Sequence, residues 1–74
     1  MLSETIREYL RAVPFEPFVV QMTDGRKFNV RHPDFATVSP KGGSLFIFRD
    51  NDAAIHLNAL LVASVETFNS AQTD

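Results

Sequence analysis

The sequence FVVQMTDGRKFNVR, residues 18–31, decides the fold of this chain. Its first half is rich in β-branched and aromatic side chains, and the residues from Lys27 to Arg31 alternate between polar and apolar. Both features favour β-strands, and the pair Asp24-Gly25 between them is typical of a tight turn. The stretch therefore predicts an antiparallel β-hairpin.

The length of the turn determines which side chains face each other across this hairpin. A two-residue loop places Val20 opposite Asn29, which mixes apolar and polar side chains on one face. A three-residue loop, residues 23–25, places Val20 opposite Phe28 and keeps one face apolar. Because a slip of one residue turns every side chain to the other face, we expect the three-residue loop. It predicts a type I turn in which Gly25 is left-handed and forms a G1 bulge.

A short amphipathic helix is predicted over residues 3–12. Ser3 is a suitable N-cap, and Glu4 lies in the first turn, where the helix dipole favours an acid. Pro14 and Pro17 end the helix, because proline lacks an N–H and disfavours helical geometry in the residue before it. A helix this short is not stable alone, so its apolar stripe must pack on the sheet. The stripe consists of Leu2, Ile6, Leu10 and Val13.

Residues 32–68 predict further short strands joined by tight turns. The His-Pro-Asp sequence at residues 32–34 should form a corner, because proline cannot donate a ladder hydrogen bond. A kink is expected at residues 58–59. The expected strands cover residues 35–39, 45–48, 53–57 and 61–68. The side chains expected to face inward from the last strand are Leu61, Ala63 and Val65.

The fold class is therefore mainly β with one N-terminal α-helix. We expect a single small domain over residues 1–68 and a frayed tail over residues 69–74. Five or six strands this short cannot enclose a core as a flat sheet, so we expect a strongly bent antiparallel sheet that closes into a small barrel. The alternative is a curved open sheet with the helix across one face.

The composition excludes several classes of protein. The chain has 74 residues, 45% hydrophobic and 22% charged, which is typical of a globular domain rather than a disordered chain. It has no cysteine, which excludes disulfides and thiolate metal sites. Its longest apolar run, residues 59–63, is far below the ~18 residues that span a bilayer. We expect a cytoplasmic protein without a membrane partner.

The sequence contains no phosphate-binding loop, metalloprotease helix or nucleophile elbow. His32, Asp34 and His56 are the only set that suggests metal binding or acid–base chemistry. A metal site needs three or four converging ligands. His32 and Asp34 flank a proline and are expected to stabilise the corner, while His56 should face solvent from its strand. We therefore expect no enzyme, no cofactor and no metal site.

An apolar outer stripe on the last strand predicts a contact surface. Leu60 and Val62 are expected on the face opposite the inward residues, where a small barrel would otherwise meet water. Phe15, between two prolines, is expected either to fix the joint between helix and strand or to be exposed for a partner. An exposed apolar stripe is typical of a protein–protein interface. We therefore expect a homo-oligomer or docking to another protein.

Basic residues cluster on the first hairpin. Lys27 and Arg31 should point outward together, with Arg26 beside them, and a phosphate backbone uses such groups. Phe35 is a candidate for stacking on a base. The net charge of −2 argues against a general polyanion binder, and charge on a sheet edge also prevents aggregation. RNA binding is therefore the alternative function.

Two resemblances extend these expectations. The pattern PFEPFVVQMTDGRKFNVRHPDF at residues 14–35 resembles a family of small uncharacterised bacterial proteins, which implies no particular activity. MTDGR at residues 22–26 and LVASV at residues 61–65 resemble Sm-like proteins, which include bacterial RNA chaperones. That resemblance implies a small barrel that forms rings and binds RNA. The RNA-contacting motifs of the Sm-like group are absent from the sequence, so a non-catalytic, self-assembling barrel is the leading hypothesis.

Overall fold

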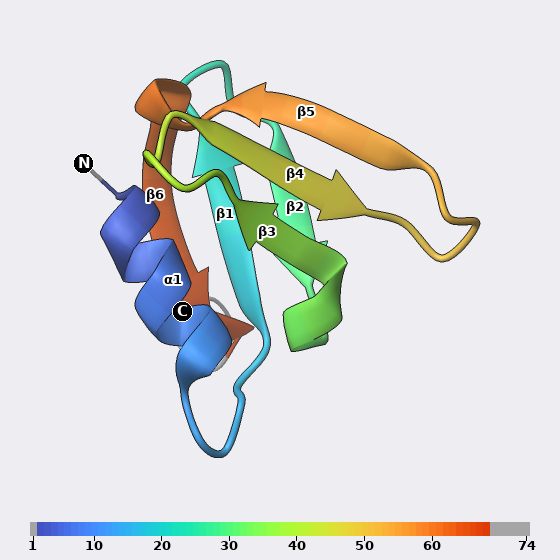
Figure 1. Cartoon of the computed structure of the whole chain (residues 1–74). Helices are drawn as coiled ribbons and strands as arrows, with labels where there is room; N and C mark the ends of the chain where they lie inside the picture. Colours follow the sequence, from blue (N-terminus) through green and yellow to red (C-terminus); the bar gives the residue numbers. More distant parts are fainter. Residues whose placement is uncertain (1, 69–74) are drawn as a thin grey trace.

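The computed structural model describes residues 2–68 and contains one α-helix and six β-strands (Figure 1). The expected tail at residues 69–74 lies outside the described residues. The elements are α1 (Ser3–Arg11), β1 (Phe18–Met22), β2 (Lys27–Val30), the 3₁₀ helix η1 (Pro33–Phe35), β3 (Ala36–Val38), β4 (Ser44–Phe48), β5 (Ala54–Asn58), the 3₁₀ helix η2 (Ala59–Leu61) and β6 (Val62–Thr67).

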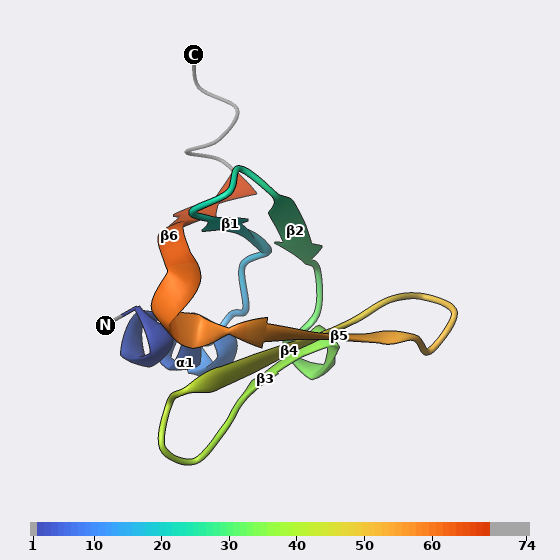
Figure 2. The ribbon, with the colours of Figure 1, turned by 90° about the horizontal axis from the view of Figure 1, so that it is seen from above.

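The strands form two antiparallel sheets of three strands each. The β1 sheet has the order β2-β1-β6, and the β4 sheet has the order β3-β4-β5. The mainly β fold with an N-terminal helix is confirmed, whereas the closed barrel is wrong: within residues 2–68 the chain forms two separate sheets that face each other (Figure 2). The physical reason lies at η1, where Pro33 interrupts the ladder and the chain crosses from one sheet to the other.

The first hairpin has the register that the sequence predicts. Val20 pairs with Phe28, and Phe18 pairs with Val30. The Met22 N–H donates to the Arg26 carbonyl at 2.8 Å, and the Gly25 N–H donates to the Met22 carbonyl at 2.9 Å, which closes a three-residue loop. Gly25 has φ +92°, in the left-handed region. The predicted bulged glycine is therefore confirmed.

The last strand differs from the prediction because it contains a β-bulge. Gln21 pairs with Ser64, but the next residue, Met22, pairs with Val62, so Ala63 is an extra residue on β6. Such an insertion reverses which side chains face the core. Ala63 is exposed and Val62 is buried, whereas Leu61 belongs to η2 and is 49% exposed. The predicted inward positions of Leu61 and Ala63 are wrong.

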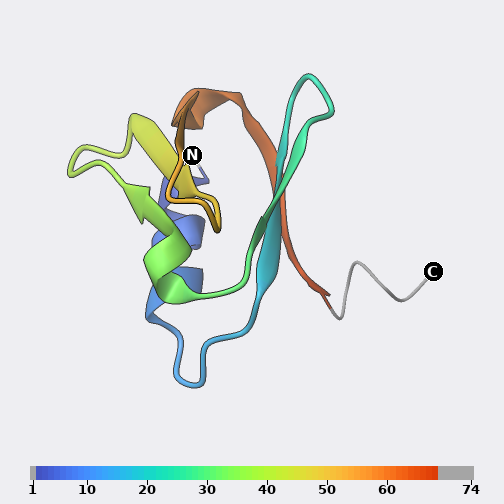
Figure 3. The same cartoon turned by 90° about the vertical axis from the view of Figure 1, so that its right-hand side faces the viewer.

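Helix α1 packs against both sheets from one side (Figure 3). Ile6 is fully buried in the core, and the Tyr9 ring lies edge-on to Phe18 at 5.2 Å. Arg7 donates to the carbonyls of Ser39 and Pro40, the latter at 2.9 Å, which fixes the helix to the β3–β4 loop. The helix agrees with the prediction except at its ends. It stops at Arg11, and Val13, which was expected in the packed apolar stripe, is 95% exposed. Its N-cap is Leu2 without a side-chain cap bond, so the capping role expected of Ser3 is wrong; Ser3 is the first helical residue and is buried.

The core lies between the inner faces of the two sheets and is closed on the helix side by Ile6. Alternate residues of each strand point into it, as expected for strands with one wet face. The best-buried side chains are Phe18, Ile6, Leu45, Val20 and Val30.

Candidate contact surface and binding groove

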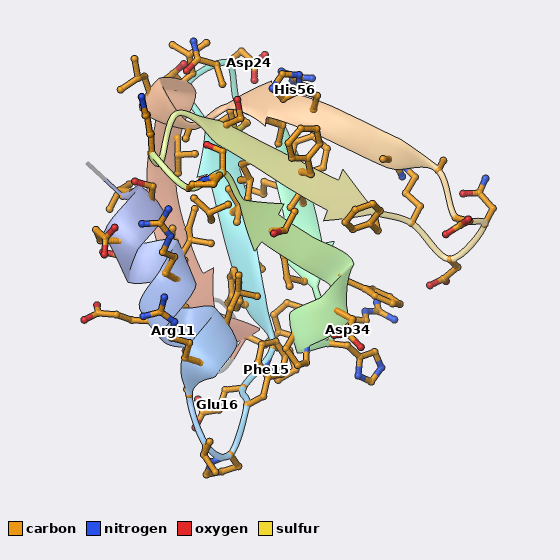
Figure 4. The ribbon with its side chains drawn as sticks, viewed as in Figure 1. Arg11, Phe15, Glu16, Asp24, Asp34 and His56 are labelled. Atoms are coloured by element: carbon orange, nitrogen blue, oxygen red, sulfur yellow. The ribbon has the colours of Figure 1, made fainter. Side chains whose placement is uncertain are left out.

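The histidines and Asp34 do not form a catalytic or metal cluster. His56 lies on β5, stacked on Phe46 with ring centroids 4.6 Å apart, whereas Asp34 lies in η1 at the far end of the molecule (Figure 4). His32 packs edge-on against Phe35 at 5.3 Å. Within residues 2–68 there is no group of three or more His, Asp or Glu side chains that could hold a metal ion. The two histidine rings are therefore placed by packing against neighbouring phenylalanine rings.

The structure exposes a different set of residues at the predicted contact surface. Leu60 is 63% exposed, as expected, but Val62 is only 8% exposed and belongs to the core, so its outward placement is wrong. Leu61 takes its place beside Leu60. Phe15 is half-buried with its ring 6.0 Å from that of Phe18, which supports its role in fixing the joint between α1 and β1.

The two exposed leucines lie between two sheet edges. Strand β5 is the last strand of the β4 sheet, and β6 is the last strand of the β1 sheet. Helix η2 joins these two strands, and the Asn58 side chain holds its first turn by accepting from the Leu60 N–H at 3.0 Å. We call Leu60, Leu61 and the adjoining edges of β5 and β6 the η2 corner.

A groove of about 310 Å³ lies at the opposite edge of the β1 sheet, beside β2. Its walls come from β2, η1 and the end of β4, so it occupies the region where the two sheets do not join. The lining residues are Lys27, Phe28, Asn29, Arg31, Phe35, Ile47, Arg49 and Asp50.

Two of the three predicted RNA-binding residues, Lys27 and Arg31, line this groove, and Arg26 does not. Arg26 is held by Asp24: its backbone N–H donates to Asp24 Oδ1 at 3.1 Å and its Nε to Oδ2 at 2.8 Å. The backbone hydrogen bond is the main reason why the pKa of Asp24 is lowered. Arg26 also lies over the Phe28 ring, 5.7 Å from its centroid.

The groove has an excess of positive charge. Three cations, Lys27, Arg31 and Arg49, face one acid, Asp50. The ion pairs formed within residues 2–68 join Arg7 to Glu4 and Arg26 to Asp24, so the groove cations stay unpaired in that part of the chain. Sequence reasoning missed Arg49 because only the tertiary arrangement brings the end of β4 near β2.

Within residues 2–68, the outer edge of β2 also presents backbone groups without a partner strand. Arg26 is hydrogen-bonded to β1 through Met22, and in an antiparallel pair the bonded positions alternate. Phe28 and Val30 are thus bonded to β1, while the N–H and C=O groups of Lys27 and Asn29 point away from it. These outward groups border the groove.

No protein-family model, curated protein or solved structure matches the chain. The resemblances to the bacterial family and to Sm-like proteins therefore stay predictions. None of the helices described in residues 2–68 is long and apolar enough to cross a membrane.

Proposed function

We propose that this protein is a non-catalytic module of the cytoplasm that acts by self-association through the η2 corner. The observation that carries the proposal is the exposure of Leu60 and Leu61 between β5 and β6, which are terminal strands of their sheets within residues 2–68. A partner that covers the exposed leucines removes their apolar surface from water, which favours association. The backbone groups at the adjoining strand edge can form hydrogen bonds with a strand of that partner. The absence of cysteine supports the proposed cytoplasmic location.

The edge of β5 is suited to pairing with a second copy. Its sequence, AIHLN at residues 54–58, carries no Lys, Arg, Asp, Glu or Pro. Natural sheet edges that avoid pairing usually carry such residues. Pairing β5 with β6 of the next copy brings Leu60 and Leu61 into the interface and is a head-to-tail contact, which closes into a ring or continues as a filament.

The test is the mass in solution of the full chain at about 100 μM, measured by gel filtration with light scattering. We expect a multiple of the 8.3 kDa chain mass. Leu60→Lys should give the monomer, because the new charge would be buried in the contact. The matched control is Val13→Lys, at a side chain that is 95% exposed and far from the η2 corner in sequence. A wild-type monomer would contradict the proposal.

RNA binding is the alternative that the sequence offers, and two of its residues, Lys27 and Arg31, support it by lining one groove. A labelled single-stranded oligonucleotide tests it: binding should weaken with salt and in a Lys27→Ala, Arg31→Ala double variant. The backbone of β2 favours a different occupant for this groove.

A further inference from the structure

We propose that the groove beside β2 binds an extended acidic peptide, which adds to the β1 sheet as a fourth, antiparallel strand. This site is separate from the η2 corner, at the other edge of the same sheet. The proposal therefore does not depend on self-association. It rests on three properties of β2: its unpaired backbone, the spacing of its charges and the apolar floor of the groove.

The backbone of β2 is arranged to accept another strand. The N–H and C=O groups of Lys27 and Asn29 point away from β1, toward the groove edge. An added strand makes its hydrogen bonds to these groups, which is the main source of affinity in peptide recognition by β-addition. The phosphodiester backbone of a nucleic acid has no N–H groups to donate to the outward C=O groups of this edge.

The side chains of β2 determine the charge of the added strand. Lys27 and Arg31 are four residues apart, about 13 Å along a strand, and both are exposed on the same face. A second copy of β2 centred on Asn29 would place Lys27 opposite Arg31, and like charges directly opposite each other are destabilising. A strand with acids four residues apart gives two favourable pairs instead. The charges thus disfavour a second β2 and favour an acidic strand.

The inner positions of the added strand meet an apolar surface. Phe28 points inward, paired with Val20, and lines the groove together with Phe35 and Ile47. On the far wall, Arg49 adds a third cation and Asp50 one acid. The volume of about 310 Å³ is at the lower end of ligand sites, which suits a few side chains rather than a large compound. The expected motif is acid, apolar, any residue, apolar, acid.

The probe is a labelled, end-capped peptide, Glu-Val-Thr-Val-Glu, whose binding is followed by fluorescence anisotropy at low ionic strength. Its control is the isomer Val-Glu-Thr-Glu-Val, which has the same charge but directs the acids toward the phenylalanines. We expect the first peptide to bind about tenfold more tightly. Equal binding of both peptides would show simple charge attraction and overturn the proposal.

A second pair of peptides tests the backbone bonds. Methylating the amide nitrogen of the central Thr removes an N–H that points at Asn29, and we expect about fivefold weaker binding, the value of one hydrogen bond. Methylating the nitrogen of the following Val changes an N–H that points to solvent and should have little effect. If both methylated peptides bind like the parent, the peptide does not add as a strand.

Charge reversal on the protein completes the test. Lys27→Glu with Arg31→Glu should lose the acidic peptide and bind Lys-Val-Thr-Val-Lys instead. The matched control, Arg11→Glu with Lys41→Glu, makes the same change in net charge outside the groove and should bind like the wild type. Circular dichroism checks that each variant folds.

Two results separate this proposal from its neighbours. The Leu60→Lys variant should bind the peptide as well as the wild type does, whether or not the wild type self-associates. Binding of a single-stranded oligonucleotide without any binding of the acidic peptide, lost in the same charge-reversal variant, would assign the groove to RNA and overturn the proposal.

Discussion

The free edges of β2 and β5 are the same kind of structure with different chemistry. Both end a three-stranded antiparallel sheet, and both leave backbone groups without a neighbouring strand within residues 2–68. The β2 edge carries Lys27 and Arg31 beside a groove, whereas β5 carries Ala54 and His56 and leads to the exposed leucines of the η2 corner.

The comparison indicates that the charge of the side chains, rather than the geometry of the backbone, determines which kind of strand can pair with each edge. Two copies of β2 repel each other, because Lys27 would face Arg31. The β5 edge has no such charge, so the proposed pairing with a copy of the same chain meets no such repulsion. The two proposals together assign self-association to one edge and a partner of opposite charge to the other.

The largest effect is expected from making β5 resemble β2. Ala54→Lys with His56→Lys places two cations on the β5 edge, where an incoming strand would have to accommodate them. We expect the protein to become monomeric at concentrations where the wild type is not, as measured by sedimentation equilibrium. Ala12→Lys with Val13→Lys adds the same charge outside the strands and should leave the mass unchanged. A double variant of β5 that still associates would show that the edge is not the contact.

The reverse change should produce a smaller gain of association. Lys27→Thr with Arg31→Thr removes the like charges from β2, and Thr favours strands. In the monomeric Leu60→Lys background, we expect weak, concentration-dependent dimers to appear in sedimentation velocity. The same two Thr substitutions at Arg11 and Lys41 serve as the control. If the β2 variant stays monomeric, the charges are not what prevents β2 from pairing with itself.

The β2 edge was accessible to sequence reasoning because its signal is local. Residues 27–31 alternate clearly between polar and apolar, and only one loop length places Val20 opposite Phe28. The outward placement of Lys27 and Arg31 follows directly from that register. Helix α1 was predictable for the same reason, apart from its cap.

The β5–β6 region and the groove were not predictable from local pattern. Leu60, Leu61 and Val62 are all apolar, so their order gives no indication that Ala63 is an extra residue. When both faces of a strand are apolar, the sequence does not show which alternate residues face the core, so the register cannot be predicted. Whether the strands close into a barrel or form two sheets depends on contacts between distant segments, which no single segment encodes. The same holds for the approach of Arg49 to β2.

The register of β2 depends on the turn at Gly25, and this gives the next prediction. At φ +92°, a side chain is strained although no atom lies within 4 Å of the new Cβ. We expect Gly25→Ala to lower the free energy of unfolding by about 1–2 kcal/mol in urea denaturation. Gly43→Ala is the control, since its Cβ is equally unobstructed and its φ lies outside the left-handed region. Equal stability of the two variants would contradict a left-handed requirement at Gly25.

The smallest effect concerns Asp24, which forms an ion pair with Arg26. Because the folded-state pKa of Asp24 lies below its ordinary value of 3.8, its charge stabilises the folded protein above that pH. This contribution is lost as the pH falls through the lowered pKa. Asp24→Asn keeps an oxygen for the Arg26 N–H but removes the charge, so the variant should be slightly less stable than the wild type at pH 7, and the difference should be smaller at pH 2. Urea midpoints at the two pH values measure the difference; a gap of the same size at pH 2 would show that Asp24 acts through geometry and not through its charge.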